Sequence, residues 1–203
     1  MTEDDHTPAP DNDPLADRGI ELTDPRAIRA YAHPVRLRLL GLPRRHGPLT
    51  ATQAAARLGE SSGTTSFHLR QLAKYGLVEE APGGRGREKP WQATSMLTHV
   101  PPIQATPEAD EAAKQLRITL ARRYFDNVLR WLQRADDAPK RWREAAMFGD
   151  RILYATPAEL KALGDAIDKL IEPYGRRLDH ADERPRNSRE VSFIGIAFPM
   201  EQP

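Results

Sequence analysis

One short segment, TTSFHLRQLAKYG at 64–76, carries at helical spacing the kinds of side chain that bind bases and phosphates. At about 100° per residue, Thr65, Leu69 and Leu72 fall on one side of a helix and should be buried. Phe67 falls on the opposite side, among polar and cationic residues. Such a mixture suits the edges of base pairs in a DNA major groove. The candidate contacts are Ser62, Gly63, Thr64, Phe67, His68, Arg70, Gln71 and Lys74.

Other helices must hold this segment in place. LTATQAAARLG predicts a short helix that is capped by Thr50 and ends at Gly59, and ESSG is the turn to the next helix. Small alanines on the short helix let two helices cross closely, as in a helix–turn–helix. Upstream, Thr23 or Asp24 caps a helix, Pro34 breaks it, and a second helix covers 35–42 before a loop at 43–48.

A basic hairpin follows the candidate helix. LVEEAP and EKPWQAT flank GGRGR, and this pattern predicts two strands joined by a glycine-rich tip. Arg85, Arg87 and Lys89 lie on or beside the tip, where a flexible cationic loop suits contact with phosphates or a minor groove. A solvated hairpin with ordinary surface charges is the alternative.

The charge distribution favours an anionic partner for this part of the chain. Residues 24–95 hold twelve Lys or Arg and five Asp or Glu, although the whole chain has a net charge of only +1. Residues 1–23 hold seven acidic residues and one Arg, with three prolines. We expect that segment to be a disordered tail.

AHPVRLRLL at 32–40, followed by TATQAAARLGESSGTTSFHLRQLAKYGLVEE and a Gly/Arg hairpin, resembles the winged helix–turn–helix regulators of the ArsR/SmtB-like family. The resemblance covers about residues 24–95. It implies a homodimer that binds a partly palindromic operator and represses transcription, and a small effector that releases the DNA. On the family pattern, His33 and His68 have structural or DNA-contact roles.

The chain departs from the metal-sensing members of that family. Those members carry Cys ligands on the helix equivalent to 50–58 or near the termini, and this chain has no Cys. Its six His show no close pairing such as two His four apart on a helix. We therefore predict a member with no metal site and no cofactor; a site of His and carboxylate ligands assembled across two chains is the alternative.

The remaining residues, 106–203, predict a C-terminal domain that contains a long helix over about 106–136. Two apolar rows make its surface wider than packing on one core requires, so we assign part of it to dimerisation. Packing within one chain is the alternative, and either row could form the interface. The first row supplies Leu116, Leu120, Tyr124, Val128 and Trp131; the second has Ile118, Ala121, Phe125, Leu129 and Leu132.

Beyond the long helix, RWREAAMFGDRILYA predicts one or two short strands, and VSFIGIAFP predicts a largely buried strand. Between them, Thr156 and Glu159 predict a capped helix. Aromatic residues of this half would line an effector pocket or, more simply, pack in a core. They are Trp131, Trp142, Phe148, Tyr154, Phe193 and Phe198.

Together these patterns predict an α+β fold, mainly α. A winged helix–turn–helix domain covers 24–98, and a C-terminal domain over 106–203 combines a long helix, a capped helix and a small sheet. The chain lacks a phosphate loop, a G-x-S-x-G elbow and a Cys nucleophile, so we expect no enzyme. No apolar run approaches the roughly 20 residues of a membrane span and no secretory signal is visible, so we expect a cytoplasmic protein.

The function predicted from these residues is that of a homodimeric, sequence-specific DNA-binding repressor. A winged-helix module that docks Phe67 on a partner protein, without binding specific DNA, is the alternative.

Overall fold

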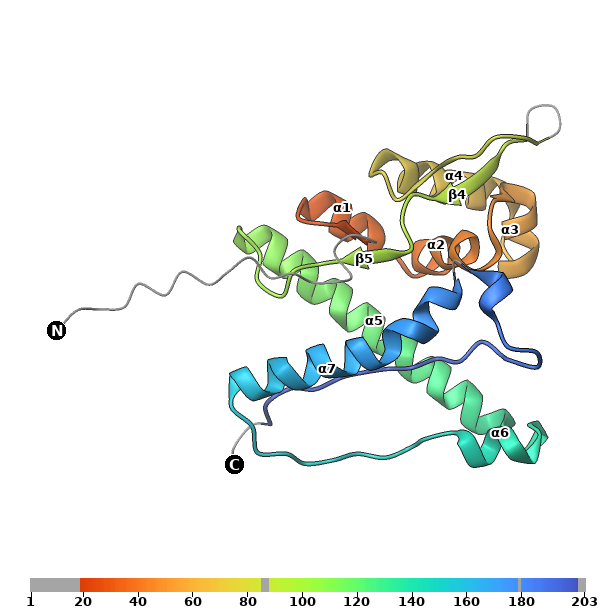
Figure 1. Cartoon of the computed structure of the whole chain (residues 1–203). Helices are drawn as coiled ribbons and strands as arrows, with labels where there is room; N and C mark the ends of the chain where they lie inside the picture. The colour runs from red at the N-terminus through yellow and green to blue at the C-terminus, as the bar shows by residue number, and fades with distance from the viewer. Residues whose placement is uncertain (1–18, 85–87, 179, 201–203) are drawn as a thin grey trace. The chain divides into compact units, whose positions relative to one another are not determined.

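The computed structural model describes residues 19–84, 88–178 and 180–200, and its contacts divide the chain into two units between Arg123 and Tyr124. The fold is α+β and mainly helical, as predicted (Figure 1). The elements of the first unit are β1 (Gly19–Glu21), α1 (Pro25–Tyr31), α2 (Pro34–His46), β2 (Leu49–Thr50), α3 (Ala51–Leu58), α4 (Ser62–Lys74), β3 (Val78–Glu80), β4 (Pro90–Ala93), β5 (Leu97–His99) and the first part of α5 (Pro107–Arg134).

The helix–turn–helix is built by local capping signals. Thr50 caps α3 in a capping box, in which its hydroxyl accepts from the Gln53 amide at 3.2 Å and its own amide donates to the Gln53 side chain at 2.9 Å. Gly59 ends α3 in the left-handed conformation, with φ 70°. Ser61 then caps α4 by accepting from the Thr64 amide at 3.0 Å. Helix α4 therefore begins at Ser62, two residues earlier than predicted.

Upstream, the helix start at Asp24 and the break before Pro34 are confirmed. The predicted loop at 43–48 is wrong in part, because α2 continues through Pro43 to His46. A proline there removes one backbone hydrogen bond, and both Leu42 and Pro43 are buried. Three basic residues in the last turn also suit the negative end of the helix dipole.

Two small sheets complete the first unit. The predicted hairpin is confirmed: β3 and β4 pair antiparallel, with Val78 opposite Ala93, and β2 adds on the other side of β4. The second sheet pairs β1 with β5 in parallel. The disordered tail predicted over residues 1–23 is wrong at its end, because Gly19–Glu21 form a strand and Leu22 is buried. Residues 1–18 lie outside the described residues.

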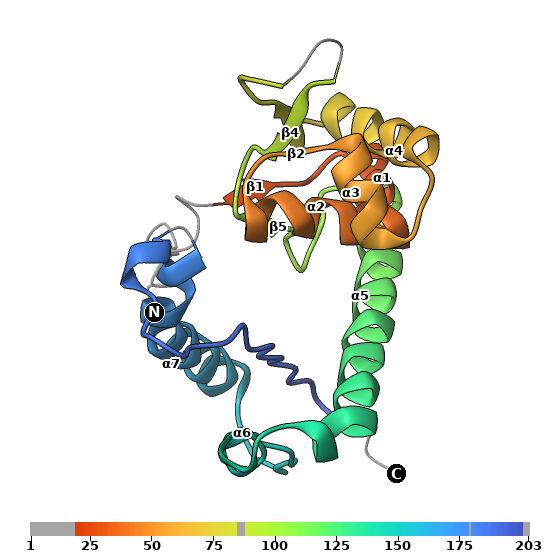
Figure 2. The same cartoon turned by 90° about the vertical axis from the view of Figure 1, so that its right-hand side faces the viewer.

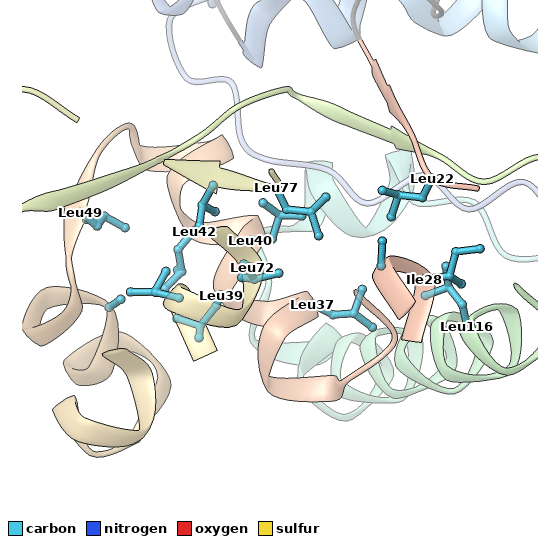
Figure 3. Close-up of a cluster of buried hydrophobic side chains, with 14 of the residues drawn as sticks. Leu22, Ile28, Leu37, Leu39, Leu40, Leu42, Leu49, Leu72, Leu77 and Leu116 are labelled. Atoms are coloured by element: carbon cyan, nitrogen blue, oxygen red, sulfur yellow. The ribbon is translucent and has the colours of Figure 1, made fainter. Parts of the chain in front are cut away.

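A single leucine-rich core joins these elements (Figure 3). Leucines of α2 and α4 meet Leu77, Leu22 and Ile28 there, and Leu116 of α5 packs into the same cluster. The first turns of α5 therefore belong to the N-terminal unit. This corrects the predicted boundary between residues 98 and 106.

The second unit contains the rest of α5, α6 (Lys140–Ala145), α7 (Pro157–Gly175) and short 3-10 turns. The predicted capping box of α7 is confirmed, with the Glu159 amide donating to the Thr156 hydroxyl at 3.3 Å. The predicted small sheet is wrong: among the described residues after 123, none forms a strand. No helix of the described residues is long and apolar enough to cross a membrane.

The C-terminal segments that were predicted as strands do not form strands, for a physical reason. Alternating side chains make a strand only where another strand supplies hydrogen bonds and a core covers one face. Phe148 is 82% exposed, and Tyr154, Phe193 and Phe198 are also exposed. These four exposed aromatic residues do not form the predicted core.

Candidate nucleic-acid interface

Helix α4 has one buried and one exposed side, as its sequence predicts. Thr65, Leu69 and Leu72 are almost fully buried, whereas Phe67 is 51% exposed. Figure 2 shows α3 and α4 side by side, with β4 and its hairpin to their left, and β3 contacts α4. Packing of one side fixes α4 on the unit, so the opposite side is presented as a rigid surface.

The exposed side of α4 gathers most of the predicted contact residues. Gln71 is half-buried, and the others are exposed: Ser62, Gly63, Thr64, Phe67, Arg70 and Lys74. The Ser61 hydroxyl donates to the Thr64 hydroxyl at 2.8 Å, so Thr64 is held at the start of the helix. Hydroxyl, amide, guanidinium, ammonium and aromatic groups thus lie along one helical surface.

His68 is the exception among these residues. Its side chain is only 8% exposed, and its ring lies 4.7 Å from that of His33, centroid to centroid. Burial, with the nearby cation of Arg36, lowers the pKa of both imidazoles. The His33 Nδ1 atom accepts from the Val35 amide at 3.3 Å and so caps α2. These contacts favour the structural role for both histidines over the DNA-contact role.

The hairpin between β3 and β4 lies next to α4, and we call it the wing (residues 78–93). Lys89 donates to Glu80 at 2.7 Å across the two strands, and this ion pair raises the pKa of Lys89. Lys89 therefore already has a carboxylate partner in the absence of a phosphate. The predicted contacts Arg85 and Arg87 lie outside the described residues.

A cleft separates the wing from the helix–turn–helix. The start of α3, one flank of α4 and the two wing strands line it, and it brings Arg70 and Lys89 together with Glu80, Glu88 and Trp91. Sequence reasoning missed Thr52, Ser66 and Glu88 in this lining. No local pattern could reveal them, because the wing meets α3 through contacts between distant parts of the sequence.

The predicted dimer residues of α5 fall into two groups. Leu116 is 1% exposed in the core of its own chain, so its side chain is not available to a partner, and Leu120 packs partly against the same core. Tyr124 and Val128 are half-buried and Trp131 is exposed. In the second row, Ile118, Phe125, Leu129 and Leu132 are all exposed.

A search of curated proteins finds no match to this chain. A family model described as a helix-turn-helix domain matches residues 31–81, about a quarter of the chain, from the end of α1 to just beyond β3. This region contains all of α2, α3 and α4. The match and the geometry of α4 together support a DNA-binding helix–turn–helix regulator rather than an enzyme.

Proposed function

We propose that this chain is a homodimeric, sequence-specific transcriptional repressor that binds a palindromic operator. The exposed side of α4 carries the proposal. Residues with base-reading and phosphate-binding groups occupy that side, while Thr65, Leu69 and Leu72 anchor the opposite side. A helix with this division can enter a major groove without disturbing its own packing.

The exposed side chains of α4 and the wing form two groups, those that would read bases and those that would bind phosphates. Gln71 has the amide that pairs with adenine, and Arg70 has the fork that pairs with guanine. Phe67 and Thr64 would lie against thymine methyl groups. Lys74 and the basic residues of the wing would bind phosphates, which fix the position of the protein on DNA without reading sequence.

A homodimer would place two α4 helices on one face of the DNA. Half-sites would then lie about 10 base pairs apart or a multiple of that spacing. The exposed apolar row of α5 supports association, since Phe125 and Leu129 present large apolar groups to solvent. Two-fold symmetry would make the operator a palindrome.

The test is selection of bound fragments from genomic DNA by the purified full chain, followed by footprinting. The proposal expects one palindromic footprint that overlaps a promoter. Phe67→Ala and Arg70→Ala should weaken binding to that fragment, while Arg57→Ala, an exposed change on α3 away from the cleft lining, serves as the control. Failure of the wild-type chain to retain any specific fragment would instead favour a protein partner for Phe67.

A further inference from the structure

Gly63 lies in the first turn of α4, two residues after the cap Ser61, and it is exposed. Outside its chain neighbours and the backbone of its own helix, a Cβ atom added there would meet a single described atom, the Ser61 Oγ at 4.0 Å. The backbone of Gly63 is helical, without the positive φ that favours glycine. Neither the packing of the described chain nor the backbone conformation therefore requires a glycine at this position.

A glycine in this helix also has a cost. Glycine loses more backbone freedom on folding than alanine does, so it destabilises the helix that contains it. An alanine would fit the folded chain at position 63 and would stabilise α4. The bare backbone at Gly63 thus leaves room on the exposed side of α4 at the expense of the helix itself.

Gly63 begins a stripe of four exposed residues along α4. At about 100° per residue, Phe67, Arg70 and Lys74 follow it on the side opposite the buried Thr65. The reach of the side chain grows along this stripe, from none at Gly63 through a ring at Phe67 to the long chains of Arg70 and Lys74. A surface that touches all four residues would therefore approach the axis of α4 most closely at the N-terminal end.

DNA fits a stripe that widens in this direction. A recognition helix in the major groove contacts base edges through its N-terminal residues. The groove is about 12 Å wide, close to the diameter of a helix with its side chains, so a helix that enters deeply leaves little room at the point of contact. Gly63 also lines the cleft next to the wing, together with Arg70.

We propose that Gly63 is the point of closest approach between α4 and the operator, and that its missing side chain sets the depth and tilt of α4 in the major groove. This inference rests on the proposed function. Gly63 is a positioning residue, because it has no side chain to contact a base and acts by bringing Phe67 and Arg70 within reach of the bases. A methyl group at position 63 should therefore have opposite effects on folding and on binding.

The first experiment compares the full chain with Gly63→Ala in thermal unfolding and in binding to the selected operator duplex and to an unrelated duplex. The unfolding midpoint should rise by about 1–4 °C. Operator affinity should fall about tenfold or more, and affinity for unrelated DNA by less than about twofold, because non-specific binding depends on phosphates rather than on base edges. Gly63→Leu has a longer side chain and should weaken operator binding further.

Gly164→Ala is the matched control. Gly164 is an exposed residue inside α7, and beyond its own helix an added Cβ atom would meet none of the described atoms within 4 Å. This substitution adds the same methyl group to a helix and should leave both DNA affinities unchanged. Unchanged operator affinity in Gly63→Ala, or equal losses for operator and unrelated DNA, overturns the proposal. A lower unfolding midpoint of Gly63→Ala also overturns it, because the fold would then require the glycine.

A double variant tests whether Gly63 acts through Phe67. Phe67→Ala should weaken operator binding by a smaller factor in the Gly63→Ala chain than in the wild type, because the ring is already held away from its base. Factors that simply multiply overturn the positioning role. A wild-type chain that retains no specific fragment defeats the proposed function and this inference together, whereas equal operator binding by the wild type and Gly63→Ala defeats this inference alone.

Discussion

The rings of His33 and His68 lie 4.7 Å apart, centroid to centroid, with their planes tilted by 38°. The pair connects the N-cap of α2 to the buried side of α4. The His68 Nδ1 atom is buried without a hydrogen-bond partner among the described residues. Helix α4 is therefore supported by an imidazole pair that is stable in its neutral form.

This pair should make the stability of the N-terminal unit depend on pH. Burial is the largest cause that lowers the pKa of both imidazoles below the ordinary value of 6.5, and the Arg36 cation is the second. At His68, the Glu60 carboxylate acts in the opposite direction and raises the pKa. The unfolded chain then binds more protons than the folded chain in the range below 6.5. The free energy of unfolding is fully retained above that value and falls as the pH drops through the lowered pKa values.

Urea unfolding of the full chain between about pH 8 and pH 5 measures this effect, at about 1.4 kcal/mol per unit of pKa difference. His68→Gln should be less stable at the upper end of that range but should show a smaller loss on acidification. His99→Gln changes an exposed histidine outside the pair and serves as the control. An identical pH dependence in the wild type and His68→Gln would show that the pair does not titrate in this range.

Phe67→Ala should weaken operator binding without destabilising the fold. The side chain is half exposed and lies opposite the buried side of α4, so its removal leaves no core cavity, while the loss of one base contact costs about 1–3 kcal/mol of binding. Leu69→Ala is the contrast, because truncation of a buried leucine costs about 2–5 kcal/mol of stability. Fluorescence anisotropy with an operator duplex, beside urea unfolding, separates the two effects. Equal losses of stability in both variants would place Phe67 in the core.

Arg85→Ala and Arg87→Ala should each reduce the salt slope of operator binding by about one. The reason is that a phosphate contact releases counterions, whatever the DNA sequence. Affinity for operator and for unrelated DNA should therefore fall by similar factors. Titrations at several salt concentrations measure both quantities. If neither variant changes affinity or slope, the wing makes no phosphate contact.

Leu129→Glu should convert the proposed dimer to a monomer. A charge placed in an apolar interface loses its hydration without gaining a partner, and we expect dimerisation to weaken by about tenfold or more. Gln133→Glu adds the same charge at an exposed polar position one turn further along α5 and is the control. Size-exclusion chromatography with light scattering gives the molar masses of the wild type and of both variants. A dimer that survives Leu129→Glu would exclude this row of α5 from the interface.

The first row of α5 shows why periodicity alone did not tell which apolar row packs within the chain. Both rows have helical spacing, and nothing in their residue types separates a row that packs on its own chain from one that faces a partner. Leu116 and Leu120 meet the core of the N-terminal unit, while Phe125 and Leu129 stay exposed. The three-dimensional path of the chain, rather than the spacing of apolar residues, decides which row is covered by the core of the N-terminal unit.

The sequence by itself determined the helix–turn–helix. Its caps at Thr50 and Ser61, its stop at Gly59 and the division of α4 into two sides all depend on residues within a few positions of one another. Such short-range signals do not depend on contacts between distant parts of the chain. The exposed surface of α4 follows directly, since burial of Leu69 and Leu72 fixes the direction of Phe67.

Only the tertiary structure decided the pairings between distant segments. Gly19 pairs with Leu97 in a parallel ladder, and Leu49 pairs with Trp91 between β2 and β4. A strand needs a partner that the local sequence does not specify, so alternation at 191–198 predicts a strand where the structure has none. The local sequence indicates which segments could form strands, and the tertiary fold determines which of them lie close enough to pair.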